Sequence, residues 1–202
     1  MFSPTMTDLS ESRMGTEYQS ERILLRPHVT TDLPRMLQIW SDPLVMRSLT
    51  GGPKTRERGM DAFHRLVQTG KGVRQSYHRA IIRRDDNVLI GTIGIDLERF
   101  SSGYTHSMVM HRETWGAGLA SEAYQLLLFA TFEHLRLHRV WTVCAQDNER
   151  AQRLITRAGF TWFGVIREFC PGPKGWLDVE AYSYLDHEWR ARQGGFAGTG
   201  GT

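Results

Sequence analysis

Two glycines, Gly116 and Gly118, stand where a strand-like stretch gives way to helical spacing of apolar residues. Glycine has no side chain to hold a ligand away from the backbone. The first turn of a helix adds free N–H groups and the positive end of the helix dipole. Such a turn can bind a phosphate or a pyrophosphate, but the two glycines alone are equally typical of a tight turn that binds nothing.

The segment from Glu113 to Ala123 resembles the acetyl-CoA pyrophosphate loop of the GNAT superfamily of N-acetyltransferases, which reads Gln/Arg-x-x-Gly-x-Gly/Ala. Glu113 departs from the Gln or Arg of that pattern. The form Trp-Gly-x-Gly-x-Ala-Ser/Thr-Glu-Ala is similar to the RimJ/RimL branch, which acetylates the N-termini of ribosomal proteins. The segment lacks the third glycine of a dinucleotide fingerprint and the Gly-Lys-Ser/Thr of a P-loop. The resemblance implies that six residues contact acetyl-CoA: Trp115, Gly116, Ala117, Gly118, Leu119 and Ala120.

A second stretch matches the same superfamily through Asn148, Ala151 and the pair Gly159-Phe160. The resemblance implies that the Asn148 side chain contacts the pantetheine arm of the cofactor or orders nearby water, and this residue can also simply cap its helix. Arg150 and Arg153 follow on that helix, and either could meet a CoA phosphate or lie in solvent. We count Arg153 among the cofactor-binding residues.

The implied reaction needs a neutral amine, a donor for the oxyanion and a base. A lysine amine has a pKa near 10.4 and an α-amine one of about 7.7–8.0, so a base helps the first far more. The resemblance places the oxyanion donor on the backbone at Val109 and Met110. It implies Glu168 as the base, although this carboxylate could equally lie on the surface. Asp96 and Glu98 are the fallback candidates.

Both usual general acids of the superfamily are missing. The Tyr that follows the motif Asn by seven residues is replaced by Ile155, and the Ser that follows it by three is replaced by Ala151. A thiol like that of Cys has a pKa near 8.5, so a thiolate can leave near neutral pH without a dedicated acid. We therefore expect catalysis to be possible, with Asn148 and Glu168 as the catalytic residues.

Length and composition indicate the class of protein that carries these motifs. The chain has 202 residues, 40% of them hydrophobic and 23% charged, which fits one globular domain. A net charge of +3 is too small to indicate nucleic acid, and it suits a polyanionic ligand such as acetyl-CoA. Cys144 and Cys170 show no metal-binding spacing, so we expect no metal and free thiols, with Cys144 buried and inert. Without a signal peptide or a long apolar segment, we expect a cytoplasmic protein.

The apolar spacing predicts the elements that must position these residues. We expect a flexible arm over residues 1–20, one domain over 21–190 and a disordered Gly-rich tail over 191–202. The strand from 139 to 145 follows a helix and should lie parallel to the strand ending at Met110. The expected strands cover 23–25, 77–82, 88–97, 104–110, 139–145, 160–169 and 176–185, and the expected helices 33–40, 55–69, 119–134 and 148–158.

This order of elements predicts an α+β fold, a single GNAT-like domain with a central mixed and twisted β-sheet flanked by helices. The resemblance implies an acetyl-CoA-dependent N-acetyltransferase that acts on a primary amine, with a protein N-terminal α-amine as the first choice. A small-molecule amine, such as a polyamine, amino sugar or antibiotic, and a non-catalytic CoA-binding regulatory domain are the alternatives. We expect a monomer or a homodimer, with neither nucleic acid nor membrane as a partner.

Overall fold

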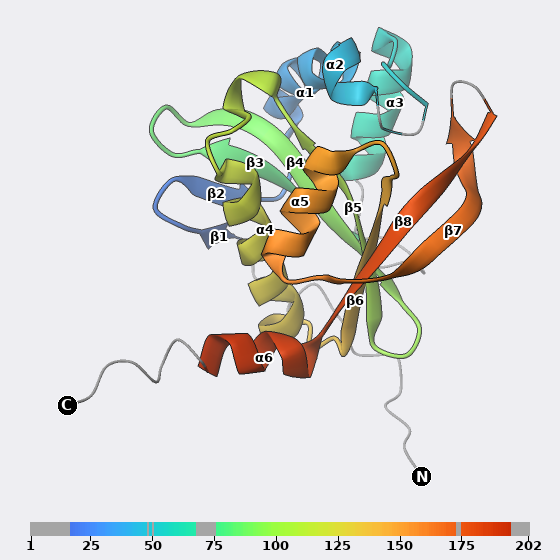
Figure 1. The fold of residues 1–202 in the computed structure, drawn as a ribbon. Coiled ribbons are helices and arrows are strands. Elements are labelled where there is room, and N and C mark those ends of the chain that lie inside the picture. Colours follow the sequence, from blue (N-terminus) through green and yellow to red (C-terminus); the bar gives the residue numbers. More distant parts are fainter. Residues whose placement is uncertain (1–16, 48, 50, 68–75, 173–174, 195–202) are drawn as a thin grey trace.

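An eight-stranded mixed sheet forms the centre of the molecule, with strands in the order β1-β2-β3-β4-β5-β6-β8-β7 (Figure 1). The computed structural model describes residues 17–47, 49, 51–67, 76–172 and 175–194. The strands are β1 (Tyr18–Gln19), β2 (Ile23–Arg26), β3 (Ser76–Arg83), β4 (Val88–Glu98), β5 (Ser102–Met110), β6 (Arg139–Ala145), β7 (Thr161–Gly172) and β8 (Gly175–Leu185). The helices are α1 (Leu33–Ser41), α2 (Pro43–Met46), α3 (Arg56–Val67), α4 (Leu119–Phe129, continued by a π-helical turn to His134), α5 (Glu149–Ala158) and α6 (Asp186–Gly194).

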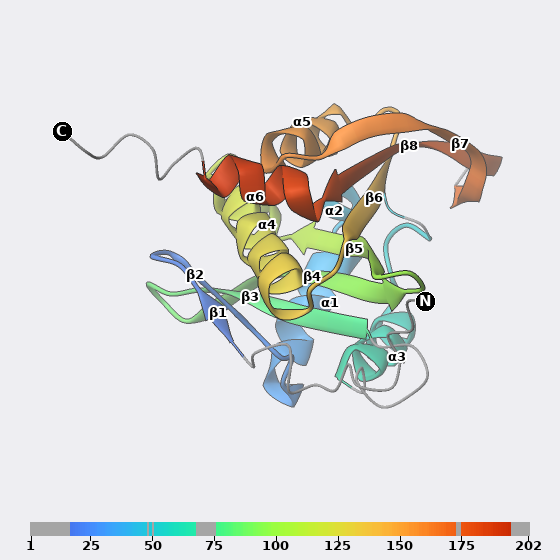
Figure 2. The same ribbon diagram turned by 90° about the horizontal axis from the view of Figure 1, so that it is seen from below.

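Helices cover both faces of the sheet (Figure 2). Side chains alternate between the two faces of a strand, so neighbouring residues of β3 enter different cores. Ile81 packs in a core with α4, α5 and α6, whereas Ala80 and Ile82 pack in a second core with α1, α2 and α3. Because both faces are covered, β3 and β4 are buried along nearly their whole length.

One parallel pairing interrupts an otherwise antiparallel sheet. β5 and β6 pair in parallel, as predicted from the helix that connects them. Their pairing covers only Ser102–Tyr104 against Arg139–Trp141. Beyond those residues, β5 keeps β4 as its neighbour and β6 keeps β8, and no pairing between β5 and β6 is found in the described chain. The two strands therefore open a wedge within the sheet.

The predicted elements agree with the structure over most of the chain, with differences at the ends. Tyr18–Gln19, which we placed in the flexible arm, form β1 because they pair with Leu24–Leu25. Residues 191–194, which we placed in the tail, extend α6. Pro171–Gly172, expected in a loop, pair with Gly175–Trp176 and lengthen β7. The rest of the arm and of the tail lies outside the described residues. In the described part of the chain, no helix has the length and apolar character needed to cross a membrane.

Candidate active site

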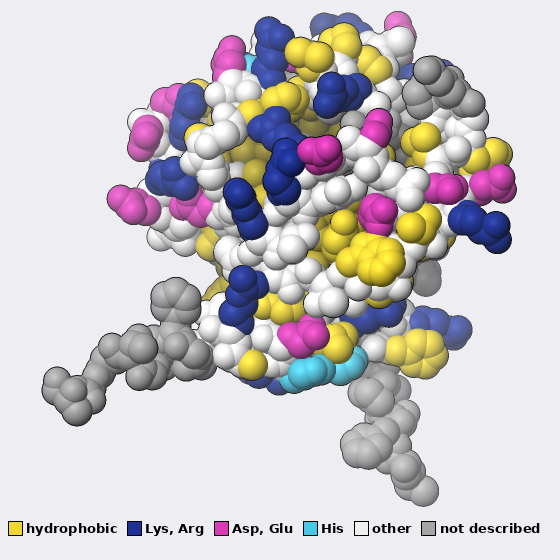
Figure 3. Space-filling view, in the orientation of Figure 1, with side chains coloured by type: hydrophobic (Ala, Val, Ile, Leu, Met, Phe, Trp, Pro, Cys, Tyr) yellow, Lys and Arg dark blue, Asp and Glu magenta, His cyan; other side chains and the backbone are white. Residues whose placement is uncertain are grey.

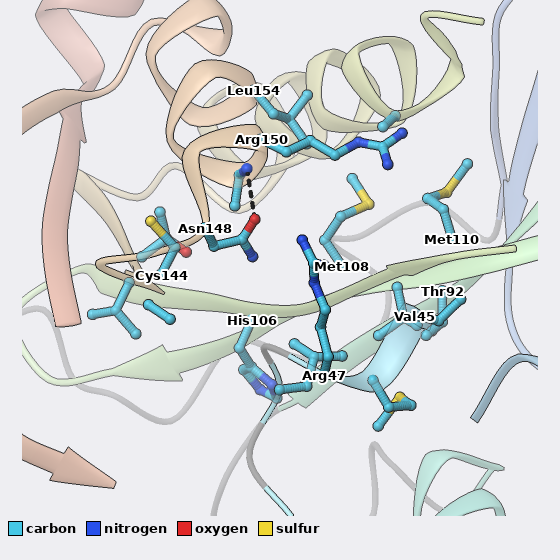
Figure 4. Close-up of a pocket in the computed structure, with 18 of the residues that line it drawn as sticks. Val45, Arg47, Thr92, His106, Met108, Met110, Cys144, Asn148, Arg150 and Leu154 are labelled. Carbon is cyan, nitrogen blue, oxygen red and sulfur yellow. Dashed lines mark hydrogen bonds between the residues drawn. The ribbon is translucent and has the colours of Figure 1, made fainter. Parts of the chain in front are cut away.

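A cavity of about 680 Å³ lies where β5 and β6 diverge (Figure 4). This volume is in the range of small-molecule sites. Residues 106 and 108–110 of β5 and residues 142–145 of β6 form two of its sides. The glycine loop and α5 contribute to one region of the lining, and residues of α2 and α3 contribute to another. The cavity therefore joins the predicted cofactor loop to a separate group of helices.

The glycine loop is built as the sequence predicts. Gly116 and Gly118 have φ values of +81° and +80°, which glycine adopts without strain, and Gly118 is the residue before α4. Arg22 anchors the loop. Its guanidinium donates a hydrogen bond to the Ala117 carbonyl at 2.9 Å and forms an ion pair with Glu122 at 2.8 Å. The first turn of α4 thus opens toward the cavity without a capping side chain.

Not every loop residue reaches the cavity. Trp115, Gly116, Gly118 and Ala120 line it, whereas Ala117 and Leu119 do not. Leu119 is buried in the core behind the loop. Val109 and Met110, the predicted oxyanion donors, line the cavity from β5. The loop and this end of β5 are also joined directly, because the Trp115 Nε1–H donates to the Met110 carbonyl at 3.1 Å.

Asn148 lines the cavity and also caps α5. Its Oδ1 accepts a hydrogen bond from the Ala151 backbone N–H at 3.1 Å. The capping role is therefore present in the structure, and the amide still lies at the cavity wall, where Figure 4 shows it. The helix cap is thus observed, and the contact of Asn148 with the cofactor stays a prediction.

The two arginines of α5 separate. Arg150 lines the cavity, and its guanidinium carbon lies 4.0 Å from the centre of the Trp115 ring. Arg153, which we selected from the sequence, pairs with Glu149 at 3.0 Å on the exposed side of the helix and does not line the cavity. The sequence contained a signal for this difference between the two arginines. Arg150 precedes Leu154 by four residues, so both lie on the face of α5 that lines the cavity.

Glu168 lies on an irregular part of β7. The register against β8 shifts between Ile166 and Cys170, and Glu168 has a φ of +50°. Its backbone N–H donates to Asp178 at 2.8 Å, while its side chain is exposed and is not part of the cavity lining. Of the fallback candidates, Glu98 accepts hydrogen bonds from Ser102 and Trp141. Asp96 takes part in a cluster that the sequence did not reveal.

That cluster consists of His78, Asp96 and His106. The sheet register places His78 beside Gly94 and Gly94 beside His106 on three adjacent strands. A Cβ on Gly94 would lie 2.3 Å from the His78 ring, so the glycine lets the two imidazoles approach to 5.2 Å between ring centres. Both histidines line the cavity. A histidine inside each of two predicted strands was the available signal, but only the long-range register shows that the two meet.

Hydrogen bonding and burial set the charges of Asp96 and His78. His106 Nε2 lies 2.7 Å from Asp96 Oδ2, and Ser76 donates to the other carboxylate oxygen. Burial raises the pKa of Asp96, but the hydrogen bonds from His106 and Ser76 outweigh it and lower this pKa to about 2. Burial, assisted by His106, lowers the pKa of His78 to about 4. An ionised Asp96 therefore faces a neutral His78. The ligand atoms of all three lie within 4.8 Å of one another, a spacing that metal ligands can also have.

Cys144, Tyr104 and Tyr124, which also line the cavity, hold their protons. Burial raises the pKa of Cys144 to about 11, with help from Glu180, so this thiol is buried, as predicted, and stays protonated. Burial also raises the pKa of Tyr104 to about 12 and raises that of Tyr124. Ile155 and Ala151, which replace the usual acids, both line the cavity. Tyr104 and Tyr124 are thus protonated phenols in the cavity lining, and the sequence motifs pointed to neither of them as a general acid.

Residues 22–161 match the family model of the acetyltransferase (GNAT) domain, which covers more than two thirds of the chain. The chain is a GNAT acetyltransferase. It is 29% identical over 181 residues to an uncharacterized N-acetyltransferase of Bacillus licheniformis named p20, covering 87% of this chain and 99% of that one. The prediction of an acetyl-CoA-dependent N-acetyltransferase is confirmed at this level.

Solved structures show the same fold for this GNAT acetyltransferase. The ribosomal-protein-S5-alanine acetyltransferase of Vibrio fischeri superimposes with a TM-score of 0.74 at 17% identity, covering 87% of this chain and 99% of that one. The spermidine N-acetyltransferase of Vibrio cholerae, solved with CoA and spermine, superimposes with a TM-score of 0.71 at 18% identity, covering 85% and 98%. At these identities the likeness establishes the α+β GNAT fold.

Proposed function

We propose that this GNAT acetyltransferase transfers the acetyl group of acetyl-CoA directly to a primary amine while both are bound. A protein N-terminal α-amine, as in the RimJ/RimL branch, is the first choice of acceptor, and a small-molecule amine is the second. The observation that carries the proposal is that one cavity is lined by the glycine loop, by the wedge between β5 and β6, and by His106, which is hydrogen-bonded to Asp96. A cofactor and an acceptor can meet there.

The proposed binding of the cofactor depends mainly on backbone N–H groups. The pyrophosphate would lie on the free N–H groups at the start of α4, with Gly116 and Gly118 leaving room for it. Arg150 adds a cation beside this site, and Asn148 faces the part of the cavity between the strands. The N–H groups at Val109 and Met110 would stabilise the oxyanion as the amine attacks the thioester carbonyl.

Two candidates can accept the proton of the attacking amine. Glu168 is the residue that the family resemblance implies. The His106–Asp96 pair is favoured by position, because His106 lines the cavity while the Glu168 side chain does not. Asp96 would then act as a positioning residue that orients the imidazole and stabilises its protonated form.

Attack of the amine forms the C–N bond, and breakdown of the tetrahedral intermediate re-forms the carbonyl and breaks the C–S bond. CoA then leaves as a thiolate that takes up a proton. Tyr124 lines the cavity and keeps its proton because burial raises its pKa. It is the candidate donor that the sequence motifs do not provide. The ammonium formed by attack can supply the same proton, directly or through water.

Acetyl-CoA turnover tests the proposal. The purified chain is mixed with acetyl-CoA and with peptides, a polyamine or an amino sugar, and free thiol is measured together with the mass of the acetylated product. Thiol release that depends on an amine supports the transferase. Tight binding of acetyl-CoA without thiol release for any amine would support a regulatory CoA-binding domain instead.

A further inference from the structure

Three cations line the cavity on the side of α2 and α3. Arg47 follows α2, Lys54 precedes α3 and Arg65 lies on α3. Figure 4 shows Arg47 reaching into the cavity, and Figure 3 shows Lys and Arg side chains around a hollow with hydrophobic side chains at its bottom. These elements differ from the glycine loop and α5, which carry Arg150. The cavity therefore holds a second group of cations, carried by elements other than the glycine loop and α5.

These three cations lack a partner of opposite charge within the described chain. No ion pair or side-chain hydrogen bond is formed by Arg47, Lys54 or Arg65 with a described residue. Burial lowers the pKa of Lys54, and the positive charges of Arg65 and Arg58 lower it further. Lys54 thus lies near other cations, and no carboxylate counters this lowering of its pKa.

The cavity lining contains no Asp or Glu among the described residues. On this side of the cavity the three cations therefore repel a positively charged ligand group and attract an anionic one. Both effects are stronger than in bulk water because the cavity is partly shielded from solvent. Arginine pairs with a carboxylate through two parallel hydrogen bonds. The apolar neighbours Leu49 and Leu66 leave the cations as the groups that can orient a polar acceptor.

We propose that the acceptor amine carries an anionic group, a carboxylate, in the same molecule, and that Arg47, Lys54 and Arg65 bind it. The inference rests on the proposed transferase function and narrows its substrate class. It disfavours polyamines and aminoglycosides, whose several ammonium groups would meet like charge. It admits both a peptide whose N-terminal segment is acidic and a small amino acid, which share the same chemistry.

Matched amines test this inference. One pair is the peptides Ala-Glu-Ala-amide and Ala-Gln-Ala-amide, and the other is 6-aminohexanoate and hexylamine, so each pair differs in the carboxylate while the amine stays similar. Spermidine serves as the polycation. We expect kcat/KM to be at least about tenfold higher for the carboxylate member of the pair that is turned over. The pair that is preferred tells whether the acceptor is a peptide or a small molecule.

Variants connect the preference to the cations. Arg47→Gln and Arg65→Gln should raise KM for the carboxylate amine about tenfold or more and leave KM for acetyl-CoA within about twofold. Arg56→Gln, on the exposed start of α3 and outside the cavity lining, is the control and should change neither.

Three results overturn the inference: equal turnover within each pair, preference for spermidine, or a rise in KM for acetyl-CoA alone, which would assign these cations to the cofactor phosphates. Absence of thiol release with every amine would instead refute the transferase function itself.

Discussion

The Arg150 guanidinium lies 4.0 Å from the centre of the Trp115 ring and so connects α5 to the glycine loop. The loop is also tied to β5 by the hydrogen bond from Trp115 to Met110, and to β2 through Arg22. Three separate parts of the chain thus hold the segment on which we expect the pyrophosphate to lie. A loop held in this way is preorganised, and binding costs little ordering.

Gly118→Asp should weaken acetyl-CoA binding by at least about tenfold, because a carboxylate beside the first turn of α4 repels the pyrophosphate. Gly118→Asn is the matched control, since it adds a side chain of the same size to the same left-handed backbone without the charge. Both variants face Arg22, whose Nη2 lies 3.5 Å from the position of a new Cβ. Calorimetry on the folded variants measures the difference, and equal affinities for the two would remove this loop from the site.

Substitution of each candidate base should show which of the two residues accepts the proton of the amine. We expect His106→Gln to lower kcat by on the order of 10²–10⁴ with little change in KM for acetyl-CoA. The loss should shrink as the pH rises and more of the amine is neutral. Glu168→Gln serves as the comparison and should retain nearly the wild-type rate, because its side chain lies outside the cavity lining. The opposite result would assign the base to Glu168.

Ala151→Ser restores the acid that the family resemblance leads one to expect. We predict that it raises kcat by at most about tenfold, near 1.4 kcal/mol of barrier, because the ammonium or Tyr124 can already supply the proton. Tyr124→Phe in the wild-type and Ala151→Ser backgrounds shows which donor acts. A gain far above tenfold from the serine would mean that the missing acid limits this protein and would favour the regulatory alternative.

Stability should depend on pH through His78. Its pKa is lowered to about 4 in the folded protein, whereas an unfolded chain has a histidine pKa of 6.5. The unfolded state therefore binds a proton first, and the free energy of unfolding should fall as the pH drops from about 6.5 to 4, by at most about 3 kcal/mol. His78→Gln should flatten this dependence, and His64→Gln, exposed on α3, should not. Urea unfolding at several pH values measures it, and parallel curves for wild type and His78→Gln would contradict the assignment.

Local patterns predicted most of the fold and the backbone geometry of the glycine loop. The glycine loop, the crossover to β6 and the cap at Asn148 depend on short segments, and each agrees with the structure. The cluster of His78 and His106 depends on the register of three strands, which no single segment contains. Whether Arg150 or Arg153 lines the cavity depends on the helix face that each residue occupies. The extent of β1 depends on its pairing with β2.

The wedge between β5 and β6 leaves backbone N–H and C=O groups along two strand edges that have no strand partner in the described chain. Amide hydrogens that lack such a partner exchange readily with solvent, whereas the opposite edges of the same strands are protected by β4 and β8. Hydrogen–deuterium exchange should therefore report occupancy without any chemical step. Saturating acetyl-CoA should slow exchange in peptides that cover residues 105–110 and 142–145 and leave β1 and β2 unchanged, so that an inactive variant can still be shown to hold its cofactor.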